Sequence, residues 1–189
     1  MTGTMYAMAG SEKRRSIDIG AEGDEPDDHA IGRSRGGLTT KTHALVDGRG
    51  LPLALALTPG QAGDSPALTR LLDQLRVPRQ GPGRPRTTPQ ALRADKAYSG
   101  RKNRDMLQSR GITVVIPEKS DAIARRKAKG CAGGRPPDFD TEDYKNRNVV
   151  ERAFNQLKNW RGPATRYDKY ALTYLGSMVL ASIILWLNA

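Results

Sequence analysis

Four side chains near the C-terminal end of the chain have a spacing that would place them together on one helix. Tyr144, Arg147, Glu151 and Lys158 follow the pattern Y-x2-R-x3-E-x6-K. At about 100° per residue, they fall within roughly 60° of one another around a helix. A stripe of apolar residues covers the neighbouring face. The pattern therefore predicts a helix with an apolar face for a core and, beside it, a row of one acid, two cations and one phenol.

A second acid, Asp95, follows a short apolar run in the phrase LRADKAYSG. Two carboxylates on separate elements of a strongly basic chain indicate metal-assisted chemistry on a polyanion. Two simpler interpretations remain open at this point. Asp95 could cap the turn that follows it, and Glu151 could be a solvated helix acid paired with Arg147, four residues earlier.

The charge of the chain points to a nucleic-acid partner. Among 189 residues, 31 are Lys or Arg and 20 are Asp or Glu, which gives a net charge of +11 and a pI near 10.1. Such a balance favours nucleic acid over an anionic membrane surface. The positive residues concentrate in two stretches, 76–104 and 119–129. We expect both to contact phosphates, the alternative being solvated loops.

Other features of the composition narrow the class of protein. A single cysteine, Cys131, allows no internal disulfide and no cysteine-based metal site, which fits a reducing cytosol. Residues 171–189 carry no charge and are rich in Leu and Ile, so a membrane span has to be considered. Polar and small residues dilute this stretch, and it predicts a buried helix rather than a membrane partner.

Hydrophobic periodicity and turn residues predict the elements in between. Residues 1–37 are polar and Gly-rich, and we expect loop with a short strand near 4–8. The following elements are strands at 38–47, 51–58, 90–94 and 112–116, helices at 67–76, 101–110, 144–161 and 169–187, and a basic flexible loop at 117–143. A hairpin followed by alternating strands and helices predicts an α/β fold, a mixed sheet flanked by helices. Asp95 lies at the C-terminal end of its strand, where such sheets place ligands.

Three parts of the sequence resemble DDE transposases of bacterial insertion sequences, specifically the insertion sequence 5 group. They are the Y-x2-R-x3-E-x6-K spacing, the phrase ADKAYSG around Asp95, and KTHALVDGRGLPLALALTPGQAGDSP. The likeness runs from about residue 29 to residue 187. It implies an RNase H-like catalytic domain over 38–189, preceded by a polar segment, 1–37, that holds the remnant of a first strand.

The resemblance also implies a reaction and its residues. In the family three carboxylates bind two Mg²⁺ ions, and Asp95 and Glu151 match the second and third of them. Tyr144, Arg147 and Lys158 would face the phosphates of transposon-end DNA, with Lys96 and Lys41 as further DNA contacts. The implied activity is metal-dependent strand cleavage and strand transfer on double-stranded DNA, by a homo-oligomer in the cytoplasm, associated with the nucleoid.

The sequence departs from the family pattern at the first acid. The family carries it in a phrase like Asp-x-Thr on the first strand, and the matching place here is Thr2, Gly3 and Thr4, without an Asp. We therefore expect an incomplete first strand and a C-terminal catalytic part that works fused to the product of an upstream reading frame. The alternatives are a non-catalytic DNA-binding remnant or regulator of transposition, and another RNase H-like nuclease.

Overall fold

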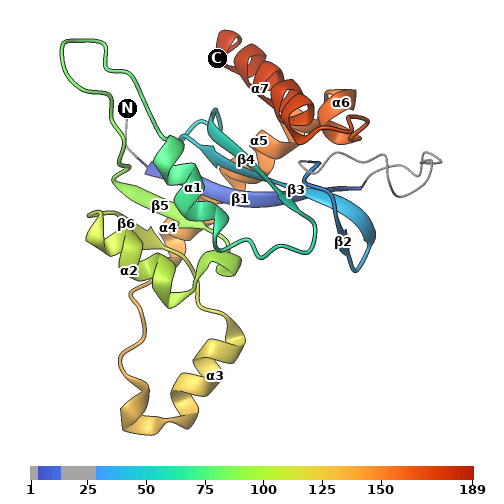
Figure 1. Cartoon of the computed structure of the whole chain (residues 1–189). Coiled ribbons are helices and arrows are strands. Elements are labelled where there is room, and N and C mark those ends of the chain that lie inside the picture. The colour runs from blue at the N-terminus through green and yellow to red at the C-terminus, as the bar shows by residue number, and fades with distance from the viewer. Residues whose placement is uncertain (1–3, 14–28) are drawn as a thin grey trace.

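A six-stranded mixed sheet forms the centre of the protein (Figure 1). The computed structural model describes residues 4–13 and 29–189. The strand order is β2-β3-β1-β5-β6, and β4 pairs with β3. The strands are β1 (Thr4–Lys13), β2 (Gly32–Ser34), β3 (Gly37–Val46), β4 (Pro52–Pro59), β5 (Ala91–Ala94) and β6 (Thr113–Val115). The predicted fold class, a mixed α/β sheet flanked by helices as in RNase H-like proteins, is confirmed.

Strand β1 lies in the middle of the sheet. It pairs antiparallel with β3 from Tyr6 to Lys13 and parallel with β5 from Thr4 to Ala7. β1 has ten residues and is therefore longer than the short strand expected near 4–8. Residues 11–13 are Ser, Glu and Lys, so no hydrophobic alternation marks them as strand, and their extended backbone is held by pairing with β3.

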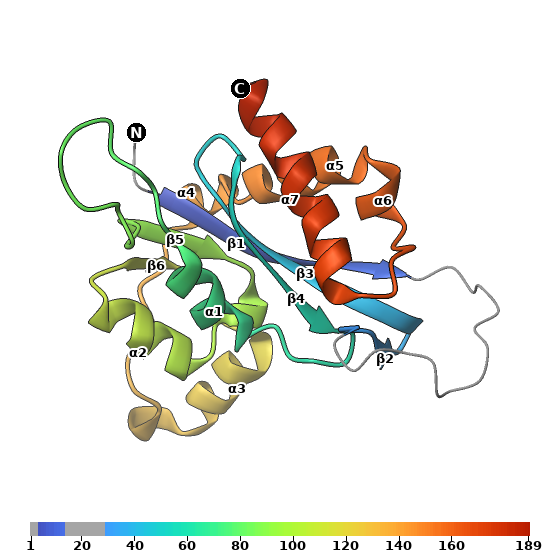
Figure 2. The ribbon, with the colours of Figure 1, turned by 45° about the horizontal axis from the view of Figure 1, so that its top comes forward.

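Helices cover both faces of the sheet (Figure 2). The helices α1 (Ala67–Gln74) and α2 (Arg101–Ser109) pack on one face, and α5 (Asn148–Lys158) and α7 (Ala171–Leu187) pack on the other. Side chains that alternate along β3 pack against the helices on both faces of the sheet. Leu45 is buried with the first pair of helices, whereas Ala44 and Val46 are buried with the second pair.

The expected single helix at 144–161 is divided into separate pieces. The helix α4 (Thr141–Lys145) ends before α5 begins at Asn148, and α6 (Arg161–Ala164) follows. The Tyr144 ring packs against Phe139, with ring centroids 5.3 Å apart. In contrast, α5 buries Val150 and Leu157 against the sheet. These different packing partners explain why one continuous axis does not run through both segments.

The segment expected to be a flexible loop, 117–143, contains the helix α3 (Ser120–Ala128) and the short 3-10 helix η2 (Gly130–Gly133). We call residues 118–135 the basic arm. It projects away from the sheet (Figures 1 and 2), and neither helix buries a residue. An ion pair of 2.5 Å between Arg126 and Glu118, both about one-fifth exposed, joins α3 to the segment that follows β6. Without a buried face, α3 leaves no strong periodic signal in the sequence.

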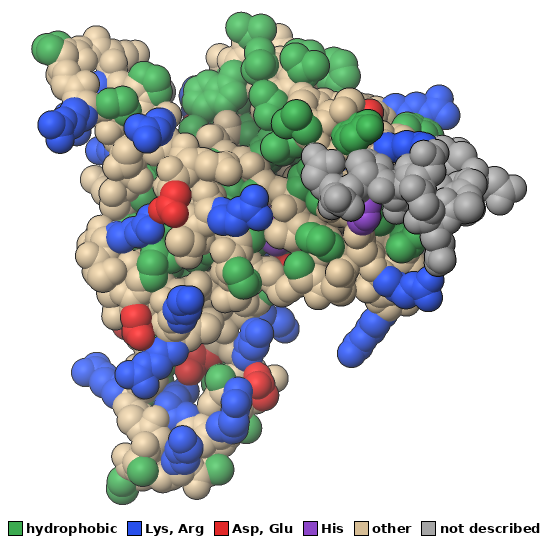
Figure 3. All heavy atoms as spheres, viewed as in Figure 1, with side chains coloured by type: hydrophobic (Ala, Val, Ile, Leu, Met, Phe, Trp, Pro, Cys, Tyr) green, Lys and Arg blue, Asp and Glu red, His purple; other side chains and the backbone are tan. Residues whose placement is uncertain are grey.

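The last helix, α7, is 17 residues long and buries Tyr174, Met178 and Ala181 against the sheet. Within residues 4–13 and 29–189, no helix is long and apolar enough to cross a membrane. The other side of α7 remains exposed, with Leu172 and Leu187 more than 70% accessible. Hydrophobic side chains accordingly gather over this helix in the space-filling view (Figure 3).

Candidate active site

Asp95 is the first residue after β5 and caps the 3-10 helix η1 (Lys96–Tyr98). Its Oδ1 accepts a hydrogen bond of 2.5 Å from the backbone N–H of Lys96. The capping interpretation of Asp95 is therefore correct as local structure. A carboxylate has about four acceptor positions on its two oxygens, so one capping bond is compatible with a further role as a ligand.

The alternation of β5 turns Asp95 toward the α5 side of the sheet. Leu92 is buried with α1 and α2, whereas the guanidinium of Arg93 lies over the ring of Tyr6, 5.1 Å from its centroid. Tyr6 belongs to the cluster that α5 and α7 complete. Asp95 is two residues after Arg93, so it follows the same side of the pleat.

Glu151 lies on α5, one turn after Arg147, and is partly exposed. Its Oε1 accepts a hydrogen bond of 2.5 Å from Nη2 of Arg147, and the same guanidinium stacks over the ring of Tyr144 at 5.7 Å. Burial raises the pKa of Tyr144; Arg147 lowers this pKa, and the charges of Asp95 and Glu151 raise it. Both acids thus lie within electrostatic reach of one phenol, and the structure brings together residues from β5, α4 and α5.

Met8 of β1 stands beside this group. The register pairs Ala7 with Ala94, so the next residue of β1, Met8, is level with Asp95. Its sulfur lies 3.8 Å from Nη1 of Arg147. Met8 therefore occupies the place on β1 where an acid would lie beside Asp95 and Glu151.

This position differs from the one expected from the sequence. Thr4 pairs with Ala91, four residues before Asp95, while Thr2 and Gly3 lie outside the described residues. Only the strand register identifies Met8, because no sequence pattern relates β1 to β5. In the described part of the chain, no three or more His, Cys, Asp or Glu side chains are grouped closely enough to hold a metal ion.

The donors at this site fit a magnesium ion in part. Mg²⁺ prefers carboxylate oxygens and usually takes one or two of them from a protein, keeping several waters. Asp95 and Glu151 are such donors, whereas the thioether of Met8 is a soft ligand that Mg²⁺ does not favour. Asp95 and Glu151 are therefore donors of the kind that Mg²⁺ takes, and among the described residues Met8 occupies the place beside them on β1.

Lys96, one of the predicted DNA-binding residues, directly follows Asp95. Lys96 and Lys119 line a cleft of about 310 Å³ together with Asp95 and Asp121. The cleft connects the end of β5 to the root of the basic arm, so phosphates near Asp95 would meet lysines from both. Lys158 is on α5, two turns after Glu151, about 10 Å further along the helix.

Lys41 lies elsewhere. It lies on the same face of β3 as Leu45, which faces α1 and α2. It forms an ion pair of 2.9 Å with Asp64. It also donates a hydrogen bond of 2.7 Å to the carbonyl oxygen of Ala62. The structure therefore does not bring Lys41 to the group formed by Arg147 and Glu151. Its charge is paired with Asp64 instead.

Behind the site, His43 is buried on the α1 side of β3. Its Nδ1 is 3.1 Å from the hydroxyl of Tyr98, and its Nε2 is 2.8 Å from Oγ1 of Thr58. Burial lowers the pKa of His43 to about 4; the charge of Asp64 opposes this shift, and nearby Lys41 and Arg70 add to it. The neutral imidazole thus supports Tyr98, in the helical turn that Asp95 begins.

We expect this histidine to make the stability of the protein depend on pH. Because the folded pKa, about 4, lies below the ordinary value of 6.5, the unfolded chain takes up the proton first as the pH falls. The contribution is present above pH 6.5 and is lost toward pH 4, with a total of about 3 kcal/mol. Urea unfolding of wild type and His43→Gln between pH 7 and pH 4 measures it. The stability difference between the two proteins should shrink on acidification, and a constant difference would contradict the assignment.

A central mixed sheet covered by helices on both faces defines an α/β protein of the RNase H-like kind. Comparison with known families gives the particular family. The Transposase DDE domain family matches residues 16–186, so the chain belongs to this family.

Two individual relatives are assigned as transposases as well. The chain is 34% identical over 151 residues to a protein of Brucella ovis assigned as a transposase for insertion sequence element IS6501, covering 80% of this chain and all of that relative. It is 32% identical over 132 residues to one of Burkholderia cepacia assigned to insertion sequence element IS402. This second match covers 70% of the chain and 55% of the relative. The resemblance inferred from the sequence is thereby confirmed.

Proposed function

We propose that this chain forms the catalytic face of an insertion-sequence transposase, which cleaves DNA strands at the ends of the element and joins them to a target. The observation that carries the proposal is the convergence of Asp95 and Glu151 on the Tyr144 and Arg147 pair, next to the cleft of Lys96. Two carboxylates among cations and a phenol suit a phosphodiester better than a neutral substrate.

The residues have distinct roles in this proposal. Asp95 and Glu151 would hold Mg²⁺, which when bound activates a water or 3′-hydroxyl and neutralises charge on the phosphate. Arg147 holds Glu151 in place and presents a planar guanidinium that can bind a phosphate with two parallel hydrogen bonds. Tyr144 is a protonated phenol at neutral pH, and the burial that raises its pKa keeps it so; it can donate a hydrogen bond to a phosphate oxygen.

Double-stranded DNA is the proposed partner, held by Lys96, Lys158 and the basic arm. The arm, residues 118–135, carries six cations and two acids, and two of its lysines, Lys127 and Lys129, are exposed near its outer end. Joining two ends of one element requires two active sites, so we propose that the protein acts as a homo-oligomer on DNA in the bacterial cytoplasm, at the nucleoid.

A second candidate function is a DNA-binding regulator that occupies transposon ends without cutting them. The specific observation in its favour is Met8, which puts a thioether in place of a third carboxylate. A measurement of metal binding distinguishes the two candidate functions without a cleavage assay, because a regulator has no need for a cation between Asp95 and Glu151.

The test is Mn²⁺ binding, followed by electron paramagnetic resonance, together with duplex binding in the absence of metal. We expect Asp95→Asn and Glu151→Gln each to weaken Mn²⁺ binding about tenfold while duplex affinity falls less than twofold. The matched control is Glu142→Gln, an exposed acid on α4 paired with Lys145. Mn²⁺ binding that is equal in all four proteins would reject the proposed metal site, and failure of the wild type to bind any duplex would reject the DNA partner.

A further inference from the structure

A hairpin of arginines lies at the end of the sheet that is remote from Asp95. Residues 76–86, which we call the arginine hairpin, connect α1 to β5. Val77 and Arg86 exchange two backbone hydrogen bonds of 2.9 Å each, which closes the base of the hairpin. Three prolines lie between these residues, and Gly83 has a φ of +136°, a conformation that favours glycine. The hairpin is thus a shaped element with a stiffened chain rather than an unstructured linker.

The charge of the hairpin is of one sign only. It contains Arg76, Arg79, Arg84 and Arg86 and has no acid. The first three are exposed, and none of the four forms an ion pair with a described acid. By comparison, exposed Arg110 on α2 is paired with Asp73 at 2.9 Å. Four cations without acids on a projecting hairpin repel one another, and a polyanion relieves this repulsion.

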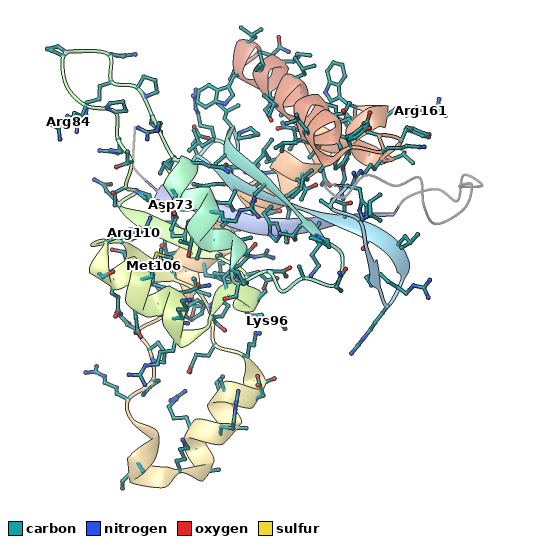
Figure 4. The ribbon with its side chains drawn as sticks, viewed as in Figure 1. Asp73, Arg84, Lys96, Met106, Arg110 and Arg161 are labelled. Atoms are coloured by element: carbon teal, nitrogen blue, oxygen red, sulfur yellow. The ribbon has the colours of Figure 1, made fainter. Side chains whose placement is uncertain are left out.

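The topology separates the hairpin from the catalytic residues. The hairpin enters β5 at its N-terminal end, and Asp95 follows the C-terminal end of the same strand. The four residues of β5 span about 13 Å, and residues 87–90, which connect the strand to the base of the hairpin at Arg86, add up to a similar length. Figure 4 shows Arg84 on the hairpin and Lys96, the residue after Asp95, at the opposite end of β5.

We propose that the arginine hairpin is a second DNA-binding element, which contacts the backbone of the duplex about seven base pairs away from the phosphate at the acids. The separation follows from a reach of roughly 25 Å and a rise of about 3.4 Å per base pair. The hairpin binds phosphates without reading sequence, and it holds the duplex in register while the catalytic face acts at the other end of the sheet. This inference rests on the proposed function, in which the duplex itself is the partner.

The experiment uses the full chain with two labelled duplexes, of 12 and 30 base pairs, both centred on the same end sequence. The 12-base-pair duplex extends six base pairs to either side of its centre and is too short to reach the arginine hairpin. The 30-base-pair duplex spans both the catalytic face and the hairpin. The variant is Arg79→Gln with Arg84→Gln, both exposed at the hairpin. The matched control, Arg33→Gln with Arg35→Gln, removes the same charge from exposed positions near β2.

For the hairpin variant we expect about a tenfold loss of affinity for the 30-base-pair duplex, and less than a twofold loss for the 12-base-pair duplex. The slope of log K against log salt should fall by about 1.8 with the long duplex, because two phosphate contacts are lost. Hydroxyl-radical footprinting should show lost protection about seven base pairs from the centre. Equal losses on both duplexes, or losses equal to those of the control, would overturn the inference while leaving DNA binding intact. Absence of binding by the wild type would instead overturn the proposed function and this inference together.

Discussion

Replacing Met8 with Asp is expected to raise Mg²⁺-dependent DNA cleavage by on the order of 100-fold, because it adds a third carboxylate beside Asp95 and Glu151. The register of β1 and β5 places residue 8 beside Asp95, and the Met8 sulfur is 3.8 Å from the guanidinium that holds Glu151. A carboxylate there would have Arg147 as a counter-charge in the absence of metal. The assay is nicking of a supercoiled plasmid that carries the genomic DNA flanking the gene, with and without Mg²⁺.

Two controls make this result specific. Met8→Asn has nearly the same shape as the Asp variant without its charge, and it should stay at the wild-type rate. Met8→Asp combined with Glu151→Gln should return to the same low rate. Mn²⁺ should also raise the melting temperature of Met8→Asp by several degrees more than that of the wild type, since a ligand that binds only the folded state stabilises it. If Met8→Asp gains neither activity nor metal-dependent stability, the third place is not at residue 8.

The second large effect is expected at Arg166, which is only 2% exposed. Its Nη1 donates a hydrogen bond to the hydroxyl of Thr40 on β3, and its Nη2 donates to the carbonyl oxygens of His29 and Lys169. The guanidinium also stacks over the ring of Tyr174 at 5.1 Å. One side chain therefore ties α7, the segment before it and the segment that leads into β2 to the middle of the sheet.

We expect Arg166→Met to lower the free energy of unfolding by about 3–5 kcal/mol, because buried acceptors lose their donor and a stacked cation is removed. Urea unfolding followed by far-UV circular dichroism measures this change. Arg161→Met, at an exposed position of α6, is the matched control and should change stability by less than about 0.5 kcal/mol. A loss below about 1 kcal/mol at Arg166 would show that the guanidinium does not hold these segments together.

The sequence alone was sufficient for the fold class and for the family. The alternation in 38–58 and the apolar runs before Asp95 and in 112–116 reflect strands that bury side chains on a pleated sheet, so periodicity predicts them well. The helical spacing of Arg147 and Glu151 is a local property of one turn, and the structure shows them bonded at 2.5 Å. The charge of +11 likewise follows from composition and points to a polyanion.

Local sequence patterns predicted the structure less well where strand pairing or tertiary packing decided it. The C-terminal half of β1 has no hydrophobic alternation and becomes a strand only through its partner β3. The basic arm buries no residue of α3, so its helix has no apolar face to reveal it. The break between α4 and α5 arises because the ring of Tyr144 packs on Phe139 while α5 packs on the sheet.

What the sequence determined by itself was therefore the class of protein and its charge, and it supplied Asp95 and Glu151 as the candidate acids. The tertiary structure decided which residues share the site: it places Met8 beside the acids, keeps Lys41 on the other face of the sheet, and puts the arginine hairpin at the far end of β5. The physical reason is that a side chain's type and its spacing along one helix or strand are encoded locally. The register between strands that are distant in the chain depends on long-range pairing, and shifting it by one residue moves every side chain to the opposite face.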